Sequence, residues 1–259
     1  NLLMRAYRWE NDGSLRLTYS KYRPFLTVRD VASRGRCHRI YSWTSERLHH
    51  LFSDLETLAF YVFDYSIEVD DIREQYPLLP LDETLEIAKK LGVKHPSFGG
   101  SQHIMTTDFL ITKSSGHLVA IQVKPLKELE SSRTLEKLEI EREYWRRRDI
   151  PFHIVTENEI PHGLAQTVSW IHQYIDGAGI NTGTMDINEY ALILVDWLKE
   201  YREASLAKGC QWADERYKMP TGTSLSTARY ALAQRMLPVM IMGGVNTLKP
   251  LIWLDEVDL

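Results

Sequence analysis

Residues 106–125 have the sequence TTDFLITKSSGHLVAIQVKP, in which two mostly apolar runs of strand length flank a short polar segment. The runs cover residues 106–112 and 118–125, and residues 113–116 between them have the composition of a turn. This stretch therefore predicts a β-hairpin.

Periodic segments lie on both sides of the predicted hairpin. Ser53-Asp54-Leu55-Glu56 has the S-x-x-E form of a capping box, which predicts the start of a helix near Ser53. Residues 66–77 alternate as a strand does, and apolar residues recur at helical spacing over 133–148, where Lys137 and Glu141 are an i,i+4 pair. A strand at 152–156 and a helix at 161–175 follow. The order helix, three strands, helix, strand, helix favours an α/β fold with a mixed sheet flanked by helices.

The segments before this region are less regular. Residues 1–20 carry mixed signals and stay unassigned, whereas a strand at 25–28 and a hairpin of 37–42 with 47–52 are expected. The stretch around residues 95–100 is expected to be rich in loops.

A glycine-rich segment predicts the domain organisation. Residues 176–183 hold three glycines between two periodic regions, which is typical of a linker and predicts domains at 1–175 and 184–259. The second domain is expected to be small, mainly helical and winged-helix-like. Its expected elements are helices at 187–206, 211–217 and 224–237 and a β-wing formed by 240–242 and 251–254. The third helix carries only Arg229 and Arg235 as bases, which favours protein binding over DNA binding.

Composition excludes several classes of protein. The chain has 259 residues, 44% of them hydrophobic and 25% charged, which argues against collagen-like and disordered proteins. Cys37 and Cys210 lie too far apart for a metal-ligand pair or a disulfide framework, so a reduced, cytoplasmic setting is expected. No apolar run approaches the roughly 20 residues of a membrane span, and the first residues do not resemble a signal peptide. A chain that opens with Asn is expected to have lost residues upstream.

Four residues around the hairpin have the chemistry of a phosphodiesterase site. Glu56 at a helix start, Asp108 on one strand, and Gln122 and Lys124 on the next could meet at one edge of the sheet. Mg²⁺ binds hard oxygen ligands and keeps several waters, so two carboxylates and one or two carbonyls suffice. Gln122 and Lys124 share one face of their strand, and Val123 between them points into the core with its backbone carbonyl available. Lys124 would orient the attacking water or stabilise charge on the phosphate.

Each of these residues also has a structural explanation. Asp108 could be an ordinary strand-edge residue, Lys124 a solvated lysine, and Glu56 half of a capping box. A zinc site at His49 and His50 with His38 is not expected, because adjacent histidines point to opposite faces of a strand and no further ligand stands at suitable spacing.

Basic residues indicate where DNA could bind. Residues 1–50 hold ten Lys and Arg against four Asp and Glu, whereas the rest of the chain holds 21 against 31. This surplus is consistent with a surface for a polyanion or with an ordinary solvated face. Arg146 and Arg147 could contact phosphate, although basic residues also favour helix C-termini. The candidate DNA contacts are Arg34, Arg36, Arg39, Arg146 and Arg147.

Motifs spread between residues 22 and 174 resemble the TnsA family, the endonuclease subunits of heteromeric bacterial transposases. The matching stretches occur in one order along the chain. They are Ser33-Arg34-Gly35-Arg36, His38-Arg39-Ile40-Tyr41-Ser42, His49-His50-Leu51, Ser53-Asp54-Leu55-Glu56, residues 71–80, Lys94-His95-Pro96, Thr107-Asp108-Phe109-Leu110, Ile121-Gln122-Val123-Lys124-Pro125, residues 133–139 and Tyr144-Trp145.

The resemblance implies a restriction-endonuclease-like nuclease domain and a specific active site. Glu56, Asp108 and Lys124 match the family's catalytic residues, and Gln122 stands where most restriction-type nucleases carry an acidic residue. The implied metal ligands are Glu56, Asp108, Gln122 and the backbone carbonyl of Val123. The implied cofactor is Mg²⁺, for which Mn²⁺ could substitute.

The resemblance further implies partners and a reaction. The family enzyme cuts the 5′ strands at transposon ends in bacterial cut-and-paste transposition, while a TnsB-type subunit cuts and joins the 3′ ends. A TnsC-type AAA ATPase binds the carboxy-terminal region. Two alternatives stay open: a stand-alone restriction or repair nuclease of the same fold, and a catalytically silent adaptor that bridges an ATPase to DNA.

Overall fold

The computed structural model describes residues 2–30, 36–98 and 101–256. The chain divides into two compact units, Asn1–Ile160 and Pro161–Leu259. The candidate catalytic residues all belong to the first unit.

A four-stranded mixed sheet forms the centre of the first unit. Its strands are β3 (Val69–Pro77), β6 (Thr106–Lys113), β7 (Leu118–Val123) and β8 (Phe152–Val155), in the order β3-β6-β7-β8. β6 pairs antiparallel with both β3 and β7, whereas β7 and β8 are parallel. The predicted β6–β7 hairpin and the predicted mixed sheet are both confirmed.

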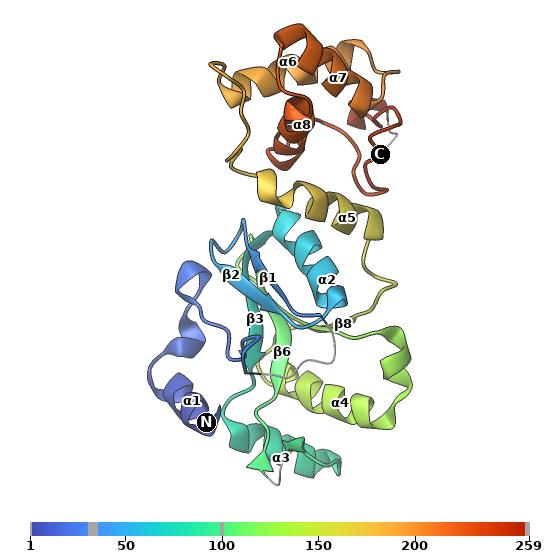
Figure 1. Cartoon of the computed structure of the whole chain (residues 1–259). Coiled ribbons are helices and arrows are strands. Elements are labelled where there is room, and N and C mark those ends of the chain that lie inside the picture. Colours follow the sequence, from blue (N-terminus) through green and yellow to red (C-terminus); the bar gives the residue numbers. More distant parts are fainter. Residues whose placement is uncertain (1, 31–35, 99–100, 257–259) are drawn as a thin grey trace. The chain divides into compact units, whose positions relative to one another are not determined.

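Helices pack on both faces of this sheet, as Figure 1 shows. On one face, Phe63 of α2 (Asp54–Tyr65) makes an edge-to-face contact with Phe109 of β6. On the other face, α3 (Leu81–Leu91) and α4 (Ser132–Arg146) share a buried core with Leu110 and Ala120. Because side chains alternate along a strand, Asp108 and Leu110 point to the same face of β6, the one covered by α4.

The start of α2 was predicted correctly. Ser53 caps the helix by accepting a hydrogen bond from the backbone N–H of Glu56. The Ser53 hydroxyl in turn donates to Glu56 Oε1 at 3.0 Å. The hairpin before it, β1 (His38–Tyr41) with β2 (Leu48–Leu51), is also confirmed. A buried ion pair between Arg47 and Glu74 joins this hairpin region to β3.

In the first unit, the structure assigns two regions for which the sequence predicted no helix or strand, and it corrects one prediction. The amino-terminal residues form α1 (Leu2–Asn11), whose Trp9 packs against Tyr22 and Phe25. Residues 25–28 are not a strand, because Phe25 and Leu26 instead bury their side chains in this cluster. The region between β3 and β6 contains α3, with an acidic first turn and a basic last turn that suit the helix dipole, and a minor hairpin of β4 (Ser97–Phe98) and β5 (Ser101–Gln102).

The second unit is helical. Its helices are α5 (His162–Ile171), α6 (Ile187–Glu200), α7 (Leu206–Tyr217) and α8 (Thr223–Ala233). The structure places the boundary before α5, whereas the sequence placed it after residue 175. Residues of α5 belong to the second unit because they pack closely against its last segment. The backbone of Gly163 lies against Gly243, where a side chain would clash, and the Thr167 hydroxyl accepts a hydrogen bond from the Val245 N–H.

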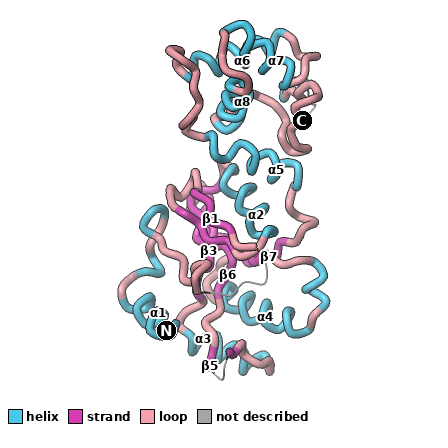
Figure 2. The backbone as a smooth tube through the Cα atoms, viewed as in Figure 1, coloured by secondary structure: helices cyan, strands magenta, loops and turns pink. Residues whose placement is uncertain are grey.

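The predicted β-wing is not formed as two strands. An isolated bridge between Val239 and Trp253 joins the two segments, and residues 161–256 are described without a strand, as Figure 2 shows. The predicted helix 187–206 ends at Glu200, and α7 starts early because Ser205 caps it. None of the helices in the described residues is long and apolar enough to cross a bilayer.

Candidate active site

Asp108 and Gln122 lie where β6 and β7 stop pairing. The last paired residues of the ladder are Phe109 and Ile121. Beyond them, Asp108 Oδ2 accepts the backbone N–H of Val123 at 2.9 Å, and Gln122 Oε1 accepts the backbone N–H of Asp108 at 3.0 Å. Side chains thus replace the backbone ladder at the end of the hairpin and fix both residues in place.

Lys124 extends from this strand end toward Asp108. Its Nζ lies 3.3 Å from Asp108 Oδ2 and donates to the carbonyl oxygen of Val123 at 2.9 Å. Burial alone would lower the pKa of the Lys124 amine, but the nearby carboxylates, chiefly Asp108 and Glu56, outweigh burial and raise it. Lys124 is therefore positively charged in the site.

Glu56 lies in the first turn of α2 and is buried. Its carboxylate accepts hydrogen bonds from the Phe52 backbone N–H and the Ser53 hydroxyl, both at 3.0 Å. Burial, together with the negative charge of Asp108, raises the pKa of Glu56 to about 7. The capping explanation is thus correct, and the same carboxyl group also interacts electrostatically with Asp108 and Lys124.

The donor set has the chemistry of a hard-cation site. Asp108 and Glu56 supply carboxylate oxygens. The Val123 carbonyl oxygen accepts from the Lys124 ammonium, which also lies beside Asp108. Gln122 Oε1 accepts one hydrogen bond from the Asp108 backbone and keeps a second lone pair free for a cation. The ammonium of Lys124 sits between oxygens of Asp108 and Val123, which shows that this position accepts positive charge. These residues fit a Mg²⁺ ion that retains several waters.

In the part of the chain that the structure describes, no group of three or more His, Cys, Asp or Glu side chains could hold a metal ion. His49 is buried beside Glu74, and His38 pairs with Asp54. Cys37 is exposed and Cys210 is buried, and neither forms a disulfide.

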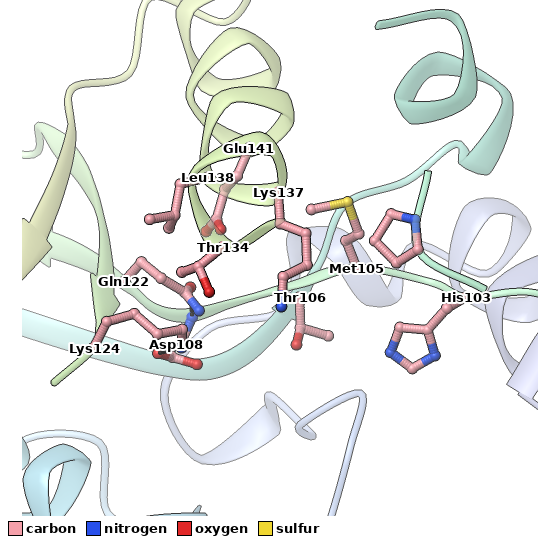
Figure 3. A pocket seen from close by; sticks show the side chains of 11 residues that line it. His103, Met105, Thr106, Asp108, Gln122, Lys124, Thr134, Lys137, Leu138 and Glu141 are labelled. Carbon is pink, nitrogen blue, oxygen red and sulfur yellow. Dashed lines mark hydrogen bonds and ion pairs between the residues drawn. The ribbon is translucent and has the colours of Figure 1, made fainter. Parts of the chain in front are cut away.

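A pocket of about 320 Å³ opens beside Asp108, Gln122 and Lys124, and one face of α4 lines it, as Figure 3 shows. The residues from α4 are Thr134, Lys137, Leu138 and Glu141. Their spacing along the helix would have placed them on one face, but the sequence alone did not show that this face covers the candidate site.

Glu141, which the sequence places in an i,i+4 pair with Lys137, is a buried carboxyl group. The structure instead gives it a hydrogen bond from the Thr107 hydroxyl at 2.6 Å, and Thr107 accepts the indole N–H of Trp145. Burial raises the pKa of Glu141 to about 8, with a further contribution from Asp108. These effects favour the protonated form of Glu141 near neutral pH.

Gln75 supports Asp108 from the neighbouring strand. Its side-chain amide donates to Asp108 Oδ1 over 3.4 Å, and its carbonyl oxygen accepts the Thr106 hydroxyl at 3.0 Å. Gln75 is buried and has a positive φ of 49°, a strained backbone conformation for a residue within a strand. Such strain is often found beside functional residues, and no local pattern in the sequence predicts it here.

The candidate DNA contacts are spread over the first unit. Arg36 is exposed and pairs with Asp54 at the start of α2, next to the turn that carries Glu56. Arg39 is exposed on β1, and Arg34 falls outside the described residues. Arg146 and Arg147, at the end of α4, both pair with Glu143. Contact of these residues with DNA stays a prediction.

Comparisons with known proteins agree along most of the chain. Residues 66–157 match the family model described as TnsA-like endonuclease N terminal, and residues 159–239 match the model described as TnsA endonuclease C terminal. The chain is 40% identical over 212 residues to the transposon Tn7 transposition protein TnsA of Escherichia coli, covering 80% of this chain and 75% of that protein.

Proposed function

The chain belongs to the TnsA family of transposition endonucleases, and we propose that it cuts the 5′ strands at transposon ends with a Mg²⁺ ion held in its first unit. The proposed ligands are Glu56, Asp108, Gln122 and the Val123 carbonyl. Mn²⁺, which also prefers oxygen ligands, could substitute.

One observation carries the proposal: Lys124 bridges Asp108 and the Val123 carbonyl at the open end of the β6–β7 hairpin. A bound divalent cation would polarise the phosphate and lower the pKa of an attacking water. The Asp108 carboxylate would be oriented to bind that cation, because the Val123 N–H and the Gln75 amide each donate a hydrogen bond to one of its oxygens. Lys124 would turn its ammonium toward the water or the phosphate oxygens.

The carboxyl group of Glu56 interacts electrostatically with Asp108 and Lys124 from the first turn of α2. Its pKa of about 7 arises chiefly because Glu56 is buried, and the negative charge of Asp108 raises it further. A cation between the two groups would remove this repulsion and favour the ionised form of Glu56. The two carboxylates are thus suited to share positive charge.

The partners follow from the family. We propose that the protein acts on DNA together with other subunits of a Tns-type transposition system, including a TnsB-type transposase. The second unit would bind a TnsC-type AAA ATPase. The small number of basic residues on α8, of which Arg229 donates to Tyr174, supports a protein partner for this unit.

A strand-specific cleavage assay tests this function. The full chain and its partner subunits are incubated with transposon-end DNA labelled on one strand at a time, with and without Mg²⁺. We expect Mg²⁺-dependent cutting of the 5′ strand, which Asp108→Asn abolishes and Asp82→Asn on the exposed start of α3 leaves intact. Cutting by the purified chain without partners would favour a stand-alone nuclease, and unaltered cutting by Asp108→Asn would favour the adaptor.

A further inference from the structure

Lys137 extends from α4 into the pocket that contains Asp108 and Lys124, toward Thr106, as Figure 3 shows. It lies one turn after Thr134 and one turn before Glu141, so the three side chains share the face of α4 that lines this pocket. Lys137 is half-buried. The backbone of a helix, which is rigid, thus holds a second lysine in the candidate active site.

The charge of Lys137 is offset only in part, by the carboxylate of Glu128. Within residues 2–30, 36–98 and 101–256, no carboxylate lies within ion-pair distance of its amine. Glu141, its neighbour one turn along, accepts a hydrogen bond from Thr107 instead. Burial lowers the pKa of Lys137, the positive charges of Lys124 and Arg133 lower it further, and the charge of Glu128 opposes them only weakly.

This arrangement differs from that of the other basic residues near α4. Lys124 pairs with Asp108, and Arg142 and Arg146 pair with carboxylates on their own helix. A half-buried ammonium next to other cations is unfavourable unless an anion occupies the space in front of it. The pocket in front of Lys137 is the one where the phosphate backbone of the substrate would enter.

We propose that Lys137 binds a non-bridging phosphate oxygen of the DNA strand in the active-site pocket and so positions that strand for cutting. The inference rests on the proposed function and adds a substrate-binding residue to it. The Thr134 hydroxyl lies on the same face and offers a second donor to the same phosphate. Lys137 acts on the strand and takes no part in holding the cation.

The test uses the full chain in its assembly with the partner subunits. Lys137→Ala should lower the rate of 5′-strand cutting about 10- to 100-fold, the loss expected for one hydrogen bond to a charged group, and Lys137→Arg should restore much of it. Cutting of the 3′ strand by the partner should be unchanged. Arg142→Ala, on the same helix but exposed and outside the pocket lining, is the matched control and should cut both strands as the wild type does.

Neutral methylphosphonate linkages, placed one at a time around the cut site, distinguish loss of a phosphate contact by Lys137 from a structural effect of the substitution on the protein. In the wild type, neutralising the phosphate that Lys137 binds should slow cutting. In Lys137→Ala the same substitution should have little further effect, while other linkages keep their effects. Wild-type cutting by Lys137→Ala, or unchanged sensitivity at every linkage, would overturn the proposal.

The proposed function can fail independently of this inference. If the nuclease assignment is wrong, Asp108→Asn cuts the 5′ strand normally, whether or not Lys137→Ala is impaired. Failure of the Lys137 proposal appears as normal cutting by Lys137→Ala while Asp108→Asn is inactive. A Mg²⁺-induced rise in melting temperature that is equal in the wild type and Lys137→Ala is expected, because Lys137 does not bind the cation.

Discussion

The ammonium group of Lys124 lies 3.3 Å from a carboxylate oxygen of Asp108 and also donates to the backbone carbonyl of Val123. Both acceptors are proposed ligands of a divalent cation. The Lys124 ammonium therefore neutralises part of the negative charge of Asp108, and a bound divalent cation would neutralise more of it. It remains close enough to act on the substrate once a cation is bound.

Mg²⁺ should raise the melting temperature of the wild-type protein. A ligand that binds only the folded state stabilises it by about 2.7 kcal/mol at a concentration of one hundred times Kd. Asp108→Asn removes one charge from the site and should lose most of this increase. Differential scanning calorimetry with and without Mg²⁺ measures it, and equal increases in the two proteins would refute the site.

Replacing Lys124 by Ala should abolish cutting but not folding. Loss of a transition-state contact of about 3–4 kcal/mol lowers the rate roughly a hundred- to a thousandfold. With the 3′ ends still cut by the partner, products in which donor and target stay joined should replace cut-and-paste products. The control is Lys113→Ala, at the other end of the same hairpin, and end-labelled DNA reports each strand. Wild-type cutting of the 5′ strand by Lys124→Ala would contradict the assigned role.

The sequence predicted the central hairpin and the helix start at Ser53, because these signals are local. Alternating apolar runs around a polar turn and an S-x-x-E motif depend on residues a few positions apart. The same locality explains why Asp108, Gln122 and Lys124 could be placed together. They lie on two strands that pair directly.

Contacts between distant segments were not predictable in this way. Gln75 contacts Asp108 across strands, and its positive φ depends on the packing of β3. The burial of Glu141 could not be predicted either, because helical spacing does not show which face α4 buries. The predicted β-wing forms only as an isolated antiparallel bridge, because two short apolar segments near a Gly-Gly pair do not specify strands of full length.

Glu141→Gln should stabilise the protein, and more so at higher pH. The folded-state pKa of about 8 lies above the ordinary value for Glu, so the unfolded chain loses its proton first and stability falls as the pH rises toward 8. Gln cannot ionise, and its amide oxygen can still accept the Thr107 hydroxyl. The melting temperatures of the two proteins, measured without Mg²⁺, should be similar near pH 5 and diverge by pH 8. A constant difference across this range would contradict the assignment.

Glu74→Gln should destabilise the first unit strongly. Glu74 is fully buried, and its carboxylate accepts hydrogen bonds from Arg47 at 2.9 Å and the His50 backbone N–H at 3.1 Å. Burial alone would raise the pKa of Glu74, but His49 and Arg47 outweigh it and hold the pKa well below the usual range. Removing one partner of a buried pair costs about 3–5 kcal/mol. Urea unfolding measures this loss, and Glu139→Gln, which breaks the exposed pair with Arg142, should cost less than about 1 kcal/mol.

The same ion pair predicts acid sensitivity. Because the pKa of Glu74 is lower in the folded than in the unfolded state, its contribution is fully present above about pH 4.3 and is lost as the pH falls below that value. Unfolding free energies measured between pH 6 and pH 3 should fall more steeply for the wild type than for Glu74→Gln. Parallel curves would show that another carboxylate controls acid unfolding.

The two units should separate cation binding from partner binding. The first unit contains every proposed cation ligand, and its sheet and helices share a buried core. The second unit buries Gly163 of α5 against Gly243, so a fragment that begins at Pro161 keeps this packing, whereas one that begins at residue 184 loses it. We therefore expect residues 1–160 to show the Mg²⁺-induced rise in melting temperature and residues 161–259 to retain a TnsC-type ATPase in a pull-down. Retention of the ATPase by residues 1–160 alone would assign partner binding to the nuclease unit instead.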